Sequence, residues 1–256
     1  MADDLRMITL DETNLADEHI CCAFADKKCG EGYEAKKRLL RERMQDGFVF
    51  RKYNVRGKVF IEYVPAEHAW APVVAPNHTF IHCFWVSGRF KGQGLGKELL
   101  QSCIDDSSGK DGVVVISTAK PKPFLTDKRF FAKHGFEVVD TAPPFYELLA
   151  LRLNPDAPPP RFAESLQTAQ PVSDSGLVVY YSNLCPFTEY YVDETLETAR
   201  EHGIEARKVK VTSAEEAQRL PTPTAVFGVF LDGEFLTHEL LNRGRLEKLL
   251  ATIGRI

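Results

Sequence analysis

Residues 80–100 combine residue types that could bind a phosphate. Their sequence, FIHCFWVSGRFKGQGLGKELL, reads as a buried strand, a loop with alternating glycines from Gly92 to Gly96, and an amphipathic helix. Glycines let backbone amides approach a ligand closely, and a helix N-terminus carries about half a positive charge. The pattern predicts a site for a diphosphate, although a plain strand-to-helix turn would look the same. The spacing matches neither the Rossmann nor the P-loop pattern. Full positive charges come from Arg89, Lys91 and Lys97.

The elements around this segment alternate between helices and strands. The run IHCFWV is apolar on both faces, so we expect it at the centre of a sheet. Asn14 predicts a helix cap with Asp17 three residues later, and Ile20 and Phe24 lie one turn apart. This order predicts an α/β (α+β) domain with a mixed central sheet. The other expected strands are 47–53, 59–64, 113–117 and 136–139, and the other expected helices are 33–45, one from Gly94, and one that ends at 133–135.

A change in composition divides the chain. Residues 154–176 hold five of the fifteen prolines and show almost no apolar periodicity, which is typical of a linker. We therefore expect one domain over 1–153 and a smaller one over 177–256. The smaller block predicts the order β-α-β-α-β-β-α.

Composition narrows the function classes. The formal charge is −4, so no global positive field favours nucleic acid. No apolar run reaches about 18 residues, and the N-terminus MADDLRMITL is acidic, so we expect a cytoplasmic protein with no membrane partner. The cysteines form no CxxC pair, which favours reduced thiols and predicts no metal site. They are Cys21, Cys22, Cys29, Cys83, Cys103 and Cys185.

Two motifs resemble the GNAT superfamily of N-acyltransferases. Lys91–Gly96 after a strand resembles its acetyl-CoA motif, and RFFAKHGFEVV at 129–139 resembles its second signature. The resemblance covers about residues 7–153. It implies transfer of an acetyl group from acetyl-CoA to an amine by direct attack, with a small molecule or a protein as acceptor. It also implies that the coenzyme lies against Trp85, Val86, Lys91, Gly92, Gln93, Gly94, Leu95, Gly96 and Lys97.

The chain departs from the GNAT pattern in two places. Lys91 stands where Arg or Gln is usual, but it retains a cation for phosphate. Phe131 stands where these enzymes often carry the tyrosine that protonates the departing thiolate. A general acid of that kind is therefore missing.

An amine acceptor requires a base, because an amine with a pKa of roughly 10 is protonated near neutral pH. The candidates are Glu62 in VFIEYV, Glu67 in PAEHAW and His82 in FIHCFW. Each could also be an ordinary structural side chain. The sequence leaves open which of the three acts, the acyl chain length, the acceptor and the oligomeric state.

The second block places Cys185 at a strand-to-helix turn, where a helix N-terminus favours the thiolate. With Thr222-Pro223 before a strand, it resembles the thioredoxin fold, whose cis-proline faces the active-site cysteine. Thr188 replaces the second cysteine, so dithiol exchange is excluded. An alternative function is therefore a monothiol binding or redox module at Cys185 and Pro223, beside a weak, CoA-sensing GNAT domain.

The two blocks together resemble the YoaP-like acetyltransferases over essentially the whole chain. The segments that carry this resemblance are HICCAF, GKVFIEYVPAEHAW, KPFLTDKRFFAKHGF and CPFTEYY.

Overall fold

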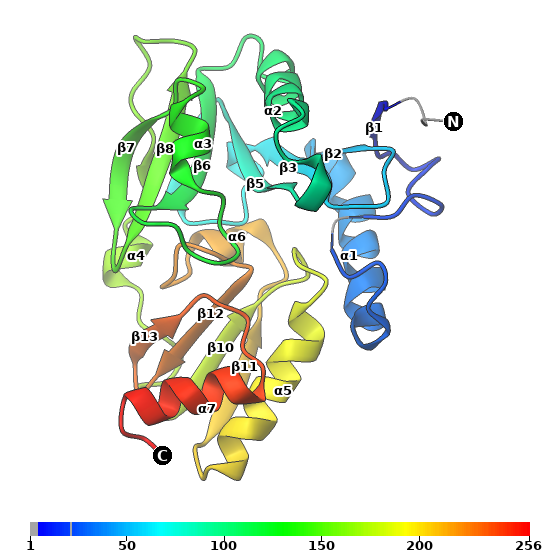
Figure 1. The fold of residues 1–256 in the computed structure, drawn as a ribbon. Coiled ribbons are helices and arrows are strands. Elements are labelled where there is room, and N and C mark those ends of the chain that lie inside the picture. Colours follow the sequence, from blue (N-terminus) through cyan, green and yellow to red (C-terminus); the bar gives the residue numbers. More distant parts are fainter. Residues whose placement is uncertain (1–4, 21) are drawn as a thin grey trace. The chain divides into compact units, whose positions relative to one another are not determined.

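A computed structural model describes residues 5–20 and 22–256 and divides the chain into two compact units (Figure 1). The first unit contains the N-terminal residues, Leu40–Ala69 and Val73–Ala163. The second contains Cys22–Leu39, Trp70–Pro72 and Glu164–Ile256. The division near Ala163 falls inside the Pro-rich stretch 154–176. The second unit also takes up two segments from the N-terminal part of the sequence.

The first unit is built on a seven-stranded mixed sheet in the order β1-β2-β3-β5-β6-β8-β7. β5 is the central strand, as its two apolar faces predicted, and it runs parallel to β6 while the other neighbours are antiparallel. The strands are β1 (Met7–Thr9), β2 (Val49–Tyr53), β3 (Val59–Pro65), β5 (His78–Val86), β6 (Gly112–Thr118), β7 (Glu137–Ala142) and β8 (Tyr146–Arg152).

The parallel pair β5 and β6 separates part-way along its length. Pairing begins at His78 with Gly112 and ends at Ile81 with Val115. β5 continues to Val86 and β6 to Thr118 without pairing to each other. A bulge lies on the other side of β5, because Tyr63 pairs with Ile81 while Glu62 pairs with Cys83, which leaves His82 as the extra residue. The sheet therefore has an open strand edge at its centre.

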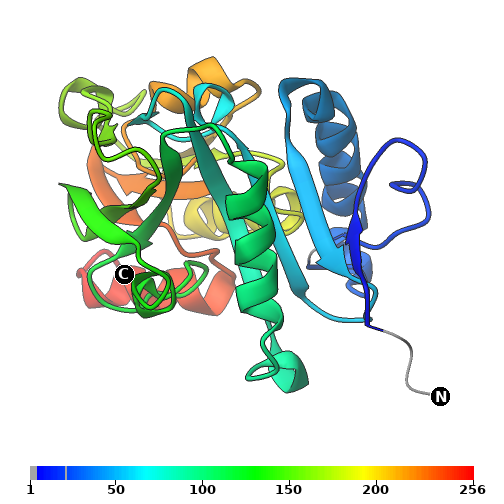
Figure 2. The same cartoon turned by 90° about the horizontal axis from the view of Figure 1, so that it is seen from above.

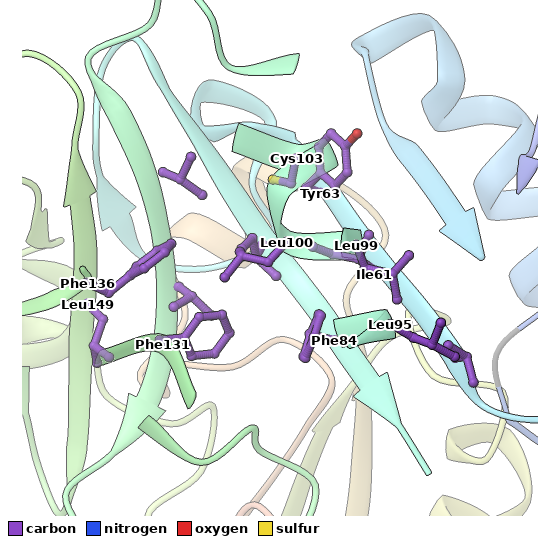
Figure 3. Close-up of a cluster of buried hydrophobic side chains, with 14 of the residues drawn as sticks. Ile61, Tyr63, Phe84, Leu95, Leu99, Leu100, Cys103, Phe131, Phe136 and Leu149 are labelled. Carbon is purple, nitrogen blue, oxygen red and sulfur yellow. The ribbon is translucent and has the colours of Figure 1, made fainter. Parts of the chain in front are cut away.

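Helix α2 (Leu95–Asp106) covers one face of this sheet (Figure 2). Its apolar stripe, formed by Leu95, Leu99, Leu100 and Cys103, is buried against strand residues such as Ile61. Figure 3 shows this cluster continuing to Phe131, Phe136 and Leu149. The helix that follows the glycine loop is thus fixed by core packing. The first unit also contains α3 (Lys128–Ala132), the 3-10 turns η2 (Met44–Asp46), η3 (Ala66–His68) and η4 (Gly88–Phe90), and a small sheet of β4 (Val73–Val74) with β9 (Arg161–Phe162).

The second unit has a four-stranded sheet in the order β11-β10-β12-β13. β10 and β11 are parallel, and the other two pairs are antiparallel. The elements follow the predicted order β-α-β-α-β-β-α. They are β10 (Leu177–Tyr181), α5 (Thr188–Glu201), β11 (Ala206–Lys210), α6 (Ala214–Gln218), β12 (Phe227–Leu231), β13 (Glu234–Thr237) and α7 (Arg243–Thr252), with α4 (Ser165–Thr168) and η1 (Lys27–Cys29) beside them.

Helix α1 (Gly30–Arg43) begins three residues before the helix predicted over 33–45. The helix predicted from Asn14 is absent from the part that the structure describes, where residues 12–18 form turns. The physical reason lies in local side-chain bonds. Asp11 Oδ1 accepts from the amides of Thr13 and Asn14, and Asn14 Nδ2 donates to the Thr9 carbonyl. Such bonds compete with a helix.

Candidate functional site

A cavity of about 510 Å³ lies at the open edge of β5, beside the glycine loop. Its walls come from β5, from the loop and first turn of α2, and from α3 with the segment before it. Trp85 contributes to the lining, and its buried Nε1 has no hydrogen-bond partner among the described residues. The lining residues are Phe84, Trp85, Val86, Phe90, Lys91, Gly92, Gly94, Leu95, Gly96, Lys97, Leu125, Thr126, Asp127 and Phe130.

Two glycines of the loop leave space beside this cavity. Gly92 and Gly94 have φ angles of 77° and 85°, which L-residues with a side chain rarely adopt. A Cβ on Gly92 would meet nothing within 4 Å. Gly94 caps α2, whose first internal bond runs from Glu98 N to Gly94 O at 3.2 Å. The amides of the first turn therefore remain available for an anion.

Two other glycines allow close packing behind the cavity. A Cβ on Gly96 would lie 3.2 Å from Phe84 Cζ, so this glycine lets the first turn of α2 approach β5. A Cβ on Gly57 would lie 2.5 Å from Phe90 Cε2. Gly57 thus makes room for the Phe90 ring in the cavity wall. Gly57 lies outside the glycine motif and was not among the predicted site residues.

The strand geometry determines which backbone groups face the open edge. Ser87 N donates to Lys58 O at 2.9 Å, so Ser87 points toward β3. Successive residues of a strand point their N–H and C=O groups to opposite edges. The backbone N–H and C=O groups of Trp85 therefore face β3 as well, while those of Phe84 and Val86 face the cavity. Of the two predicted strand residues, Val86 has its backbone groups on the cavity side of β5, and Trp85 has them on the β3 side.

Thr126 lines the cavity and contacts two strands of the sheet. Its hydroxyl donates to the Phe84 carbonyl at 2.9 Å, and its own carbonyl accepts from Ser117 Oγ at 2.8 Å. Ser117 lies on β6 and is buried. A chain of two side-chain hydrogen bonds therefore connects β6 to β5 where the backbone ladder between them has ended. Thr126 was not predicted from the sequence.

The three predicted base candidates lie in different surroundings. Glu62 on β3 is 1% exposed and pairs across the strand with Cys83. His82 is half-buried at the bulge, with its ring stacked on Phe48 at 5.4 Å between centroids. Glu67 is exposed, and its Oε1 accepts from the Asn77 amide at 2.6 Å. Glu62 and His82 thus lie on neighbouring strands at the bulge, outside the described lining of the cavity, whereas Glu67 stabilises a loop.

Phe131 cannot reach the cavity. Its side chain is fully buried, with ring centroids 5.5 Å from Phe130 and 5.2 Å from Phe136. It belongs to the core beneath α2 (Figure 3). At this position the chain therefore has a core side chain that is not part of the described cavity lining.

Polar contacts also fix α2 to the sheet. The Tyr53 hydroxyl donates to Glu98, and the Tyr63 hydroxyl donates to Asp106, which also pairs with Arg51 at 2.9 Å. Burial, together with the acidic partner, raises the pKa of both tyrosines. These bonds hold the helix whose N-terminus faces the cavity.

Cys185 lies in the second unit, three residues before α5. It is half-buried, and Thr188 Oγ1 donates to the Cys185 carbonyl at 2.8 Å. In the same unit Gly32 leaves room for the Pro186 carbonyl, and Lys28 Nζ lies 4.7 Å from the Tyr190 ring centroid. The segment 22–39 therefore packs beside the turn that carries Cys185.

The peptide bond before Pro223 is trans, because the cis bond found among the described residues is Pro143-Pro144. The cis-proline implied by the thioredoxin resemblance was therefore wrong. Thr222, which precedes it, is fully buried, and a Cβ on Gly228 of β12 would lie 3.0 Å from its methyl carbon. Thr222 packs against the sheet.

The described cysteines form no disulfide with one another, and Cys21 lies outside the described residues. Burial raises the pKa of Cys29 to about 11. Within residues 5–20 and 22–256, no three His, Cys, Asp or Glu side chains are grouped to hold a metal ion. In the same ranges, no helix combines the length and apolar character that crossing a membrane requires.

The predicted coenzyme residues gather around one cavity, except Gln93, whose Nε2 donates to Arg89 O at 2.6 Å. Phe84 and Phe90 lie within residues 80–100, but their residue types alone did not predict a place in the cavity wall. Leu125, Thr126, Asp127 and Phe130 come from a stretch that sequence patterns did not connect to β5. Only the folded chain brings them there.

Comparison with known proteins agrees with this architecture. The family described as "Acetyltransferase (GNAT) family" matches residues 13–136, and the family described as "YoaP-like" matches residues 206–248. A protein of Bacillus subtilis (strain 168), "Uncharacterized N-acetyltransferase YoaP", is 40% identical over 249 residues, which are 96% of this chain and 99% of that protein. The chain belongs to the YoaP-like GNAT acetyltransferases.

Solved GNAT structures are similar to part of this YoaP-like acetyltransferase. A GNAT acetyltransferase from Brucella melitensis in complex with acetyl-CoA is 16% identical, over 61% of this chain and 92% of that one, with a TM-score of 0.38. The PaiA N-acetyltransferase from Thermoplasma acidophilum in complex with coenzyme A is 14% identical, over 58% and 99%, with a TM-score of 0.41.

Proposed function

We propose that this GNAT acetyltransferase binds acetyl-CoA in the cavity beside β5 and transfers the acetyl group directly to an amine. The observation that carries the proposal is the position of this cavity, which lies between an amide-rich loop and an open strand edge. The coenzyme supplies an acetyl thioester. Its acceptor is a small molecule or a protein with a free amine.

The residues present fit a diphosphate and an extended arm. The first-turn amides of α2 and the charges of Lys91 and Lys97 would hold the diphosphate. Space is left for it, since a Cβ on Gly92 would meet no atom within 4 Å. Val86 would pair with an amide of the arm as an added strand does.

Residues near the bulge would act on the reacting groups. The amide of Phe84 faces the cavity side of β5, where it would donate to the thioester oxygen and stabilise the negative charge that develops there. Glu62 or His82 would take the proton from the incoming amine. The position of Glu67 on the Asn77 amide does not support that role.

The test is calorimetric titration with acetyl-CoA, followed by a thiol-release assay over a panel of amines. Binding of one acetyl-CoA per chain, with thiol release that depends on one class of amine, supports the proposal. Failure to bind acetyl-CoA would contradict it. Matched titration of Lys91→Glu and Lys133→Glu variants shows whether binding depends on the loop, because Lys133 lies outside the cavity lining.

A further inference from the structure

The cavity of this protein holds a single side-chain hydroxyl among the described lining residues, that of Thr126. The other lining side chains are apolar, cationic or glycine, apart from the indole of Trp85 and the carboxylate of Asp127. The carboxylate cannot donate a proton while it is ionised, and hydrogen bonds from Arg129 hold the pKa of Asp127 below its usual value. Thr126 is therefore the lining residue whose neutral hydroxyl is held directly at the open strand edge, through its bond to the Phe84 carbonyl.

Its position next to Phe84 is set by strand geometry. The N–H and C=O groups of one strand residue lie side by side on the same edge. Thr126 Oγ1 bonds the Phe84 carbonyl at 2.9 Å. Any atom held by the Phe84 amide would therefore lie beside the Thr126 hydroxyl. Ser117 fixes the Thr126 backbone from β6, so this hydroxyl is supported from both strands.

Phe131 stands at the position where many GNAT enzymes carry the tyrosine that protonates the departing thiolate. Phe131 is fully buried and has no hydroxyl. A sulfur that leaves into a cavity lined largely by apolar atoms requires a donor, because an unpaired charge in such surroundings is costly.

From these contacts we propose that Thr126 is a catalytic residue that stabilises the departing thiolate of coenzyme A. This inference rests on the proposed function. As the amine nitrogen forms its bond to the acyl carbon, the carbon–sulfur bond breaks and its electron pair moves to sulfur. The Thr126 hydroxyl turns from the Phe84 carbonyl and donates a hydrogen bond to that sulfur. Thr126 keeps its proton, and the amine proton leaves through the base.

The proposal predicts a property of bound coenzyme A that is independent of turnover. The thiol of a cysteine side chain in a model peptide has a pKa of about 8.5. A hydrogen bond to a charged group favours that charged form by about 10- to 100-fold. The thiol of bound coenzyme A should therefore ionise at lower pH than the free thiol, and affinity should rise with pH.

The experiment measures the affinity of coenzyme A and of desulfo-coenzyme A, which lacks the sulfur, from about pH 7 to about pH 9.5. Other titratable groups near the site act on both ligands and cancel in the ratio of the two affinities. They are Lys91 and Lys97 from the loop and α2, Asp127 before α3, and His82 and Cys83 from β5.

For the wild-type protein, the ratio should rise by about tenfold over this range. Thr126→Val, which keeps the shape and removes the hydroxyl, should abolish the rise, and Thr126→Ser should retain it. Desulfo-coenzyme A should bind wild type and Thr126→Val equally, which shows that the loop is intact. An unchanged rise in Thr126→Val would overturn the role of Thr126. If the wild-type protein bound neither coenzyme A nor desulfo-coenzyme A, that result would instead overturn the proposed function.

Discussion

The Thr126 hydroxyl and the Phe84 carbonyl are hydrogen-bonded at 2.9 Å, although the two residues are 42 positions apart in the chain. The bond lies beyond the last pair of β5 and β6, Ile81 with Val115. It joins the loop after β6 to the edge of β5 that faces the cavity. The bond therefore places the Thr126 hydroxyl at the edge of β5 that faces the cavity, while Ser117 holds the Thr126 backbone from β6.

A negative charge in the glycine loop should abolish coenzyme binding. Gly94→Glu places a carboxylate at the cap of α2, where a diphosphate would bind, so we expect acetyl-CoA affinity to fall by about 100-fold or more. The measurement is calorimetric titration with acetyl-CoA.

Gly109→Glu is a matched control for this change. Gly109 also has a positive φ, of 82°, and a Cβ there would meet nothing within 4 Å. It lies beyond the opposite end of α2, which is about 18 Å long. Both variants carry the same charge and a similar backbone strain of about 1–2 kcal/mol. Equal loss of affinity in the two variants would show that strain, not the loop, is responsible.

Restoring the family tyrosine should harm the protein. Phe131→Tyr puts a hydroxyl into a fully buried core position among Phe84, Phe130 and Phe136. A buried hydroxyl without a partner costs about 1–3 kcal/mol, so urea denaturation should show a lower free energy of unfolding. Thiol release should not increase. A variant of normal stability with faster turnover would mean that this side chain does reach the reacting groups.

Glu62 and Glu67 should respond differently to loss of charge. Glu62→Gln removes a buried carboxylate near the bulge, so we expect turnover to fall by about 100-fold while the affinity for acetyl-CoA stays the same. Glu67→Gln keeps an oxygen that can accept from the Asn77 amide, so turnover should change by less than about twofold. Initial rates of thiol release at saturating acetyl-CoA check both. If Glu62→Gln is fully active, His82→Ala identifies or excludes the second candidate.

Alkaline pH should weaken the attachment of α2. Burial and Glu98 raise the pKa of Tyr53, so the folded protein keeps this proton above about pH 10 while the unfolded chain loses it. The contribution of the Tyr53 hydroxyl to the free energy of unfolding is therefore fully present below about pH 10, and it is lost as the pH rises toward the folded-state pKa of Tyr53. Tyr53→Phe should be less stable by about 1.5 kcal/mol at neutral pH.

The difference in the free energy of unfolding between wild type and Tyr53→Phe isolates the effect of Tyr53, because other tyrosines with a raised pKa, such as Tyr63 and Tyr181, are present in both proteins. Unfolding by urea from about pH 8 to about pH 11 should show a flatter decline for Tyr53→Phe. Parallel declines would indicate that Tyr53 titrates alike in both states.

Much of the fold could be predicted because strands and amphipathic helices leave periodic patterns. The central position of β5 follows from its apolar residues on both faces, and α2 follows from the stripe that begins at Leu95. The helix expected from Asn14 was wrong because side-chain bonds from Asp11 stabilise turns instead. β8 was missed, since its buried residues carry no clear alternation.

The site could be predicted only where one segment supplies it. The glycine loop can be predicted from its residue types and their spacing. Thr126 cannot, because its position depends on contacts with Ser117 of β6 and Phe84 of β5, which form only when the chain folds. The edge that the backbone groups of Trp85 face could not be predicted either, because it depends on the pairing register of β3 and β5. That register turns the N–H and C=O groups of Trp85 toward β3.

The most direct test of this account is calorimetric titration of the wild-type protein with acetyl-CoA, in parallel with the Gly94→Glu and Gly109→Glu variants. The account predicts one acetyl-CoA per chain for wild type and for Gly109→Glu, and no measurable binding for Gly94→Glu. Absence of binding to the wild-type protein, or undiminished binding to Gly94→Glu, would contradict the assignment of this cavity to the coenzyme.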